Sequence, residues 1–273
     1  MLGDTSMCTH SFRAVPHEGV TLNSSIAGNE LKVVDNGAYR SLLYRSKDGS
    51  ELLSSQISLM HPDIPTTSDT RELLASFLLA PVQNHVMVVG VRNIGLLKFL
   101  RSFSSAQFIE VIERDSSLIS TADVYFDLRP DERLTIQQDD NLDYLLSRSV
   151  GTYDVIYVDQ IPSEEPGIRD VAMLDSLCGK LNETGVMMTI LRGNNISIAR
   201  SIDQVIQVFP HVFVWDSPEG DSVVLAAVKH RQLVNPLVFR ERARKLDSRV
   251  NAGFSFAGFI DPMVAGEYRV TGL

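Results

Sequence analysis

The pattern of hydrophobic and polar positions becomes regular at residue 85 and stays regular to about residue 230. Short, nearly continuous apolar runs alternate there with longer segments in which apolar residues recur every three or four positions. Runs such as Val86-Met-Val-Val89 and Val155-Ile-Tyr-Val158 are typical of parallel strands with helices on both faces of the sheet. We therefore predict an α/β fold. The predicted strands are 85–90, 107–112, 132–138, 153–158 and 184–191, and the predicted helices are about 94–103, 116–125, 140–149, 169–181 and 195–208.

The regular series closes with two further strands, 211–215 and 222–228. Only the segment 216–221 separates them, which is too short for a crossover helix, so we expect these strands to pair as an antiparallel hairpin. Five parallel strands followed by a hairpin indicate the seven-stranded sheet of the class I methyltransferase-like, Rossmann-like fold. The same short connection disfavours a nicotinamide-dependent dehydrogenase.

Residues 30–65 predict a small β-hairpin domain ahead of this sheet. Asp35-Asn-Gly37 and Lys47-Asp-Gly49 separate short apolar segments, and both Asn-Gly and Asp-Gly favour hairpin turns. Leucines at helical spacing then predict a helix over 71–79.

We expect four parts along the chain: an irregular segment at 1–29, the β-hairpin domain at 30–65, the methyltransferase-like domain at 66–230 and a C-terminal helical extension at 231–273. A basic stretch over 229–249 reads as a solvated helix face or as a surface for an acidic partner. The apolar, glycine-rich segment 252–258 is expected to pack back on the body or to form part of a subunit interface.

Composition and charge restrict the classes of partner. The formal net charge of −9 at pH 7 disfavours a nucleic-acid surface, which needs clustered Lys and Arg. The six histidines have no metal-ligand spacing, and Cys8 and Cys178 lie far apart, as expected of reduced thiols. No signal peptide and no membrane-spanning run is evident, so we expect a cytoplasmic protein whose partners are small molecules or proteins.

Acidic residues follow three of the predicted strands: Glu113, Asp140 and Asp159. Open α/β sheets bind their ligands at the carboxyl ends of the strands. The loop Gly90-Val-Arg-Asn-Ile-Gly95 joins a strand to a helix at the same edge, as nucleotide-binding loops do. Each acid also has a purely structural interpretation: a solvated turn for Glu113, a helix N-cap for Asp140 and a strand-end turn for Asp159.

The order of elements and these acids resemble the spermidine synthase family over about residues 30–230. The resemblance implies binding of S-adenosylmethionine, its decarboxylated form or methylthioadenosine. Glu113 would then contact the ribose, Asp140 the adenine amino group and Gln56 the nucleoside. Asp159 would be the catalytic residue, a carboxylate that orients or deprotonates an amine nucleophile. Members of the family commonly dimerise, which implies a homodimer.

Several positions depart from the family's pattern. Asn93 replaces the aspartate that binds the ammonium group of the decarboxylated cofactor, and Arg92 and Ile94 replace glycines. Thr70-Arg71 replaces the first two residues of a Tyr-His-Glu motif, and Pro162 replaces a second aspartate. A guanidinium pairs well with a carboxylate, which intact S-adenosylmethionine carries and the decarboxylated form lacks. A ligand-facing Arg92 therefore favours methyl transfer, or another use of intact S-adenosylmethionine, over aminopropyl transfer. The alternative is that Arg92 points to solvent and the loop no longer binds this ligand.

Three functions stay open on the sequence alone. The leading hypothesis is a transferase that binds S-adenosylmethionine or a related nucleoside and moves a methyl or aminopropyl group to an amine on a small molecule or a protein. One alternative is a spermidine synthase proper with a rewired amine site, and the other is a non-catalytic binding protein that retains the fold. The residues assigned to cofactor binding are Gln56, Gly90, Arg92, Asn93, Glu113 and Asp140, with Asp159 as the catalytic residue and no metal.

Overall fold

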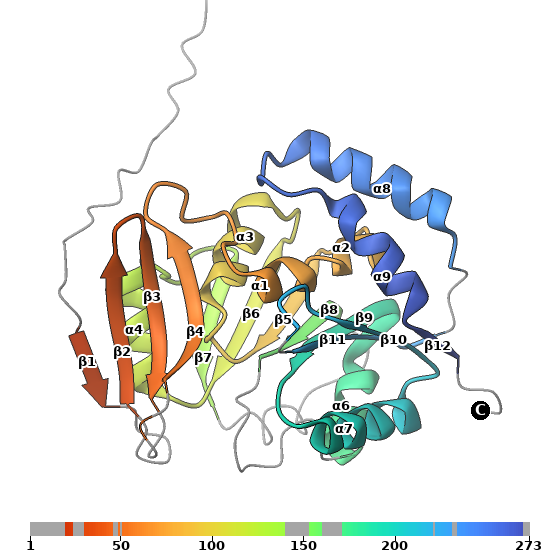
Figure 1. Ribbon diagram of the computed structural model, residues 1–273, viewed down its shortest axis with the longest axis horizontal. Helices are drawn as coiled ribbons and strands as arrows, with labels where there is room; N and C mark the ends of the chain where they lie inside the picture. The colour runs from red at the N-terminus through yellow and green to blue at the C-terminus, as the bar shows by residue number, and fades with distance from the viewer. Residues whose placement is uncertain are drawn as a thin grey trace, which may run out of the picture.

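The computed structural model describes residues 20–23, 30–45, 49, 51–139, 153–159, 171–220, 222–230 and 234–269. The described elements form two sheets that lie next to each other, a small one from the N-terminal part of the chain and a large one from the rest (Figure 1). The candidate residue Asp140, the departure at Pro162 and the predicted helix over 140–149 lie outside the described residues.

The large sheet has the strand order β12-β10-β11-β9-β8-β5-β6-β7. Neighbouring strands from β9 through β7 run parallel to one another, whereas β11 pairs antiparallel with both β9 and β10. Five parallel strands and a terminal hairpin confirm the predicted fold class. An eighth strand, the short β12, pairs with β10 at the sheet edge and was not predicted. The strands are β5 (His85–Val89), β6 (Phe108–Glu113), β7 (Leu134–Gln138), β8 (Tyr153–Val158), β9 (Leu181–Leu191), β10 (His211–Asp216), β11 (Val223–Val228) and β12 (Glu267–Arg269).

Both faces of this sheet are buried, which explains why its central strands are continuously apolar. On β5, Val86 and Val88 belong to one hydrophobic cluster, and Met87 and Val89 belong to the cluster on the opposite face. Successive side chains of a strand point to opposite faces, so a strand covered twice needs apolar residues at every position. The first cluster includes residues of α3 (Ile94–Phe103) and α4 (Ser116–Phe126), and the second includes residues of α6 (Val171–Lys180) and α7 (Asn195–Val208).

The small sheet is antiparallel, in the order β1-β2-β3-β4. Its strands are β1 (Val20–Asn23), β2 (Glu30–Asn36), β3 (Tyr39–Arg45) and β4 (Glu51–Ser58), of which β1 was not predicted. Buried Arg40 attaches the sheet to the body, since it pairs with Asp35 at 2.7 Å and donates to the backbone oxygen of Tyr125 on α4 at 2.6 Å. A buried guanidinium needs such partners, so this contact fixes where the small sheet sits.

The predicted helix over 71–79 was wrong in one respect, because the chain forms two short helices, α1 (Ser68–Leu73) and α2 (Ser76–Leu79). The Leu74 N–H bonds to the oxygen of Arg71 and the Ala75 N–H to that of Glu72, a three-residue spacing that tightens and ends α1. Ser76 then starts α2 with its hydroxyl 2.6 Å from that of buried Tyr157.

The C-terminal segment packs back on the body, which confirms the first of the two expectations for 252–258. It comprises α8 (Pro236–Arg249), a 3₁₀ turn (Phe256–Phe259) and α9 (Ile260–Ala265). Phe256 is 1% exposed and meets Phe77 of α2 edge to face, with 6.2 Å between ring centroids. Within the described ranges, every helix is too short or too polar to cross a membrane.

Candidate functional site

The loop between β5 and α3 is pressed against the end of β8. Gly90 has a φ of +102°, and its N–H donates to the oxygen of Ile112 at 2.8 Å. A Cβ at this position would lie 2.5 Å from the backbone oxygen of Asp159. No side chain fits that space, so Gly90 is required both for its backbone angle and for the close approach of the two segments.

Glu113 ends β6 directly beside this loop. Its Oε2 accepts the Val91 N–H and its Oε1 accepts the Asp115 N–H, each at 2.9 Å. The side chain is 3% exposed. Each carboxylate oxygen can accept more than one hydrogen bond, so Glu113 holds the loop and retains acceptor capacity toward a ligand.

Asp159 follows β8 and lies at the same edge as Glu113. Its Oδ2 accepts the backbone N–H of Asn93 at 2.5 Å. Burial raises the pKa of Asp159, while the Arg92 charge and the Asn93 hydrogen bond act in the opposite direction, with a smaller opposing contribution from Arg192. A carboxyl group whose pKa is raised holds a proton more readily, which suits a proton acceptor.

Arg92 joins the loop to the small sheet. Its guanidinium lies over the ring of Tyr44 on β3, with 5.2 Å from Cζ to the ring centroid. Burial lowers the pKa of Arg92, and the charges of Asp159 and Glu113 act to raise it. Because a guanidinium stays charged even when its pKa falls, Arg92 adds a positive charge that interacts with both acids.

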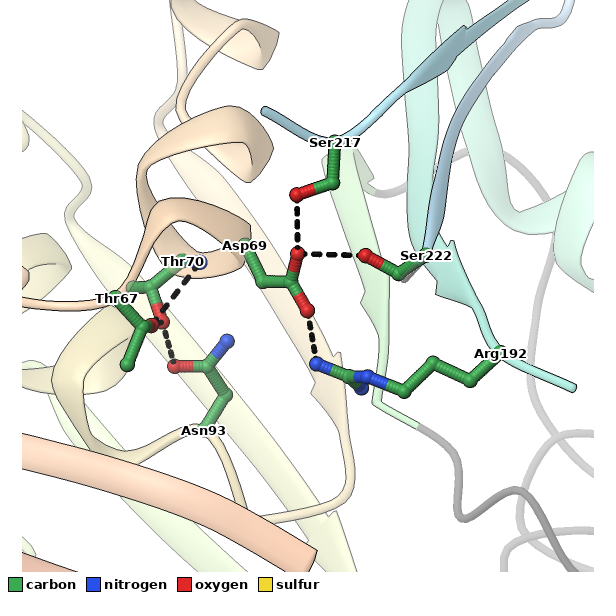
Figure 2. Close-up of polar contacts among 7 residues, drawn as sticks. All are labelled: Thr67, Asp69, Thr70, Asn93, Arg192, Ser217 and Ser222. Carbon is green, nitrogen blue, oxygen red and sulfur yellow. Dashed lines mark hydrogen bonds and ion pairs between the residues drawn. The ribbon is translucent and has the colours of Figure 1, made fainter. Parts of the chain in front are cut away.

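Asn93 and Ile94 begin α3 without any unusual backbone angle. Asn93 is the N-cap, with a φ of −83°, and its Oδ1 accepts the Leu96 N–H at 3.2 Å and the Thr70 hydroxyl at 2.9 Å (Figure 2). Ile94 is fully buried in the core. Among the described residues other than glycine, only Asp127 has a positive φ. Ile94, which stands where the resembled family has a glycine, therefore needs no unusual backbone angle, and its side chain packs into the core.

Gln56 lies on β4, against the start of α3. Its side-chain nitrogen donates to the Ser41 hydroxyl at 3.1 Å, and its backbone oxygen accepts the Thr66 hydroxyl at 2.8 Å. The amide is thus used within the small sheet, and its contact with a nucleoside stays a prediction. Asp140 lies outside the described residues, so its predicted contact is also untested.

A polar cluster that the sequence did not predict lies at the same edge of the large sheet (Figure 2). Asp69, at the start of α1, accepts the hydroxyls of Ser217 at 2.8 Å and Ser222 at 2.7 Å. Its other oxygen pairs with Arg192, which directly follows β9. The cluster ties α1, β9 and the turn of the β10–β11 hairpin together. The only signal in the sequence was an acid in the first helical turn, which reads as an ordinary helix start.

Glu72 matches the glutamate of the family's Tyr-His-Glu motif, and its side chain binds another residue of the protein. Its Oε2 accepts the indole N–H of Trp215 at 2.7 Å, and burial raises the pKa of the Glu72 carboxyl. In the ranges that the structure describes, no group of three or more His, Cys, Asp or Glu side chains could hold a metal ion. The edge therefore offers carboxylates, amides and guanidinium groups, which suit binding and proton transfer.

No protein-family model matches the chain. Two relatives do, both named eEF1A lysine and N-terminal methyltransferase. The protein from Danio rerio is 26% identical over 193 residues, which cover 64% of this chain and 28% of the relative. The protein from Xenopus laevis is 23% identical over 187 residues, which cover 63% of this chain and 27% of the relative. The chain thus spans little more than a quarter of the length of these relatives.

Solved structures show the same fold. Human methyltransferase-like protein 13 in complex with SAH aligns with a TM-score of 0.60 and 20% identity, over 67% of this chain and 92% of that one. A probable spermidine synthase from Corynebacterium glutamicum aligns with a TM-score of 0.66 and 17% identity, over 83% of this chain and 86% of that one. A spermidine synthase in complex with the transition-state analogue AdoDATO aligns with a TM-score of 0.57 and 18% identity, over 85% and 86%. These likenesses establish a mixed α/β fold shared by class I methyltransferases and spermidine synthases, with an antiparallel N-terminal sheet.

Proposed function

We propose that the chain is an S-adenosylmethionine-dependent methyltransferase that acts on an amine group of a protein. The names of the two relatives support both the reaction and a protein substrate. A structural neighbour in complex with SAH, and another in complex with AdoDATO, support the binding of an S-adenosyl nucleoside by this fold.

The observation that carries the proposal is the meeting of three strand ends around Gly90. The loop after β5 approaches Asp159 so closely that only glycine fits, and Glu113 at the end of β6 holds the loop through the Val91 N–H. This is the edge at which open α/β sheets bind their ligands. Under this proposal Glu113 would contact the ribose and Asp159 would lie at the reacting end.

When bound, S-adenosylmethionine supplies an electrophilic methyl carbon, which an amine nitrogen displaces from sulfur while the carbon–sulfur bonding electrons stay on the sulfur. The nitrogen takes over the positive charge and then gives up a proton. Asp159 is the proposed acceptor of that proton, because burial raises its pKa toward the range in which a carboxylate is an effective base. Most of the rate would come from holding the two reactants in line.

Charges at the site support intact S-adenosylmethionine rather than the decarboxylated form. Arg92 lies near Asp159 and Glu113 and adds a positive charge that suits a ligand carboxylate. Two acids of the described part of this edge already have partners within the protein: Asp69 binds two serines and Arg192, and Glu72 binds Trp215. Aminopropyl transfer is the second candidate, favoured only by the overall likeness to spermidine synthases.

Calorimetric titration with S-adenosylmethionine, S-adenosylhomocysteine and methylthioadenosine tests the nucleoside site. The proposal expects saturable binding of all three. The Asp159→Asn variant tests the chemistry, because Asn retains an oxygen for the Asn93 N–H and loses the proton acceptor. We expect this variant to bind S-adenosylhomocysteine and to transfer methyl groups to a protein acceptor roughly 100-fold more slowly. Unchanged turnover would exclude Asp159 as the proton acceptor, and absence of any nucleoside binding would leave a non-catalytic function.

A further inference from the structure

The neighbours of Asn93 determine which way round its side-chain amide sits. Both the Leu96 N–H, at 3.2 Å, and the Thr70 hydroxyl, at 2.9 Å, contact Oδ1. A backbone N–H can only donate, so the group facing it must be the amide oxygen. The Leu96 N–H also bonds to the backbone oxygen of Asn93 at 3.1 Å, so it keeps a partner in either arrangement. A rotated amide would still set its own N–H groups against the Leu96 N–H, and two donors in contact are unfavourable.

The hydroxyl of Thr70 is also fixed in its direction. A hydroxyl has a single hydrogen, and that of Thr70 is used on Asn93. The contact of 2.7 Å between the Thr67 and Thr70 hydroxyls must therefore have Thr67 as the donor. Thr67 is the N-cap of α1, so the chain of hydrogen bonds from Thr67 to Asn93 is anchored at a helix start (Figure 2).

The amide nitrogen of Asn93 is consequently presented as a donor. It has no hydrogen-bond partner among the residues that the structure describes. In Figure 2 it lies on the side of the amide turned toward Asp69 and Arg192. The backbone N–H of the same residue donates to Asp159, so this donor lies on the residue that adjoins Asp159 in the site.

We propose that Asn93 is a specificity residue, whose amide nitrogen donates to the carboxylate at the amino-acid end of the cofactor and so selects intact S-adenosylmethionine over its decarboxylated form. This inference rests on the proposed function. An aspartate at position 93 would have the opposite preference, because its second oxygen would present a negative charge that attracts ammonium and repels carboxylate.

The Asn93→Asp variant tests this inference with little disturbance of the fold. Aspartate is as good an N-cap as asparagine and keeps an oxygen for Leu96 and Thr70. Asn235→Asp is a matched control, since Asn235 is the N-cap of α8, where its side chain accepts the Leu237 N–H at 3.0 Å. Both variants and the unaltered chain are titrated with S-adenosylhomocysteine, which carries the carboxylate, and with methylthioadenosine, which lacks the whole amino-acid end.

We expect Asn93→Asp to weaken S-adenosylhomocysteine binding roughly 10- to 100-fold, the range for a lost hydrogen bond to a charged group. Methylthioadenosine binding should change by less than about twofold, and Asn235→Asp should change neither. Decarboxylated S-adenosylmethionine should bind the Asn93→Asp variant more tightly than it binds the unaltered chain.

A pair of variants at Thr70 tests the orienting hydrogen bond separately. Thr70→Ser keeps the hydroxyl donor and should keep the ratio of S-adenosylhomocysteine affinity to methylthioadenosine affinity. Thr70→Val removes the donor and should lower this ratio several-fold. If the ratio of S-adenosylhomocysteine affinity to methylthioadenosine affinity were unchanged in Asn93→Asp, this inference alone would be overturned. That includes the case in which both ligands bind more weakly by the same factor. If the unaltered chain bound none of the nucleosides, the proposed function would fail and the inference with it.

Discussion

Replacement of Gly90 by alanine adds a single methyl group but should strongly reduce both stability and ligand binding. The backbone there has a φ of +102°, and for a residue with a Cβ this angle is unfavourable by about 1–3 kcal/mol. The new Cβ would also lie 2.5 Å from the backbone oxygen of Asp159, so one strand end must move, which adds roughly 1–3 kcal/mol. The sum is about 2–6 kcal/mol, or a melting temperature lower by roughly 4–24 °C at about 2–4 °C per kcal/mol.

Gly37→Ala is the matched control, because Gly37 also has a positive φ, of +58°, but an added Cβ meets nothing within 4 Å. The control should lose only about 1–2 kcal/mol. Thermal unfolding of both variants and titration of each with S-adenosylhomocysteine are the assays. We expect Gly90→Ala to lose binding as well as stability, while Gly37→Ala binds normally. A Gly90→Ala protein that melted like the control and bound S-adenosylhomocysteine with unchanged affinity would refute the described contact between the loop and β8.

Three other predictions concern stability and assembly. Burial raises the pKa of Glu72, so the contribution of this carboxyl group to stability is greatest at low pH and is lost as pH rises. Glu72→Gln still accepts the Trp215 N–H, so its free energy of unfolding should rise relative to that of the parent between about pH 4 and pH 8. Urea unfolding at each pH measures this difference, and a difference that does not change with pH would contradict it. Asp69→Asn should lower the free energy of unfolding by about 2–3 kcal/mol, because it breaks the pair with Arg192. In urea denaturation, the double variant with Arg192→Met should lose less free energy of unfolding than the two single variants lose together, and strictly additive losses would mean that the pair is not coupled. A homodimer, implied by the resemblance to spermidine synthases, should give twice the 30.3 kDa chain mass by light scattering, and a monomer mass at micromolar concentration would exclude it.

The fold could be predicted because burial on both faces of a sheet leaves a local pattern. Val86 to Val89 and Val155 to Val158 are apolar at every position, and each strand occurs where this pattern predicts. The short connection 216–221 likewise determined the hairpin. Strands β1 and β12 have four and three residues, too few to show a pattern, and they form because the edge of a neighbouring strand is available to pair.

The site could be predicted only in part. Gly90, Glu113 and Asp159 meet as the strand order requires, since the carboxyl ends of adjacent parallel strands share one edge. The cluster around Asp69 could not be predicted, because its two serine partners lie 148 and 153 residues further along the chain. Local patterns report which residues are buried and give no indication of which distant polar groups meet.

The altered loop also shows where reasoning from a family pattern misleads. Arg92 and Ile94 stand where the family that the sequence resembles has glycines, residues that permit unusual backbone angles. In the structure these positions require no positive φ, and Ile94 packs into the core, so only Gly90 needs to be glycine at the contact with Asp159. The substitutions therefore change the charge and hydrogen-bonding character of the loop and leave its backbone path possible.

Titration of the unaltered chain with S-adenosylhomocysteine tests the central claim most directly. We predict saturable binding of one ligand per chain, which is lost in Gly90→Ala and retained in Gly37→Ala. Absence of binding to the unaltered chain, at ligand concentrations up to roughly 1 mM, would contradict a cofactor site at the meeting point of Gly90, Glu113 and Asp159.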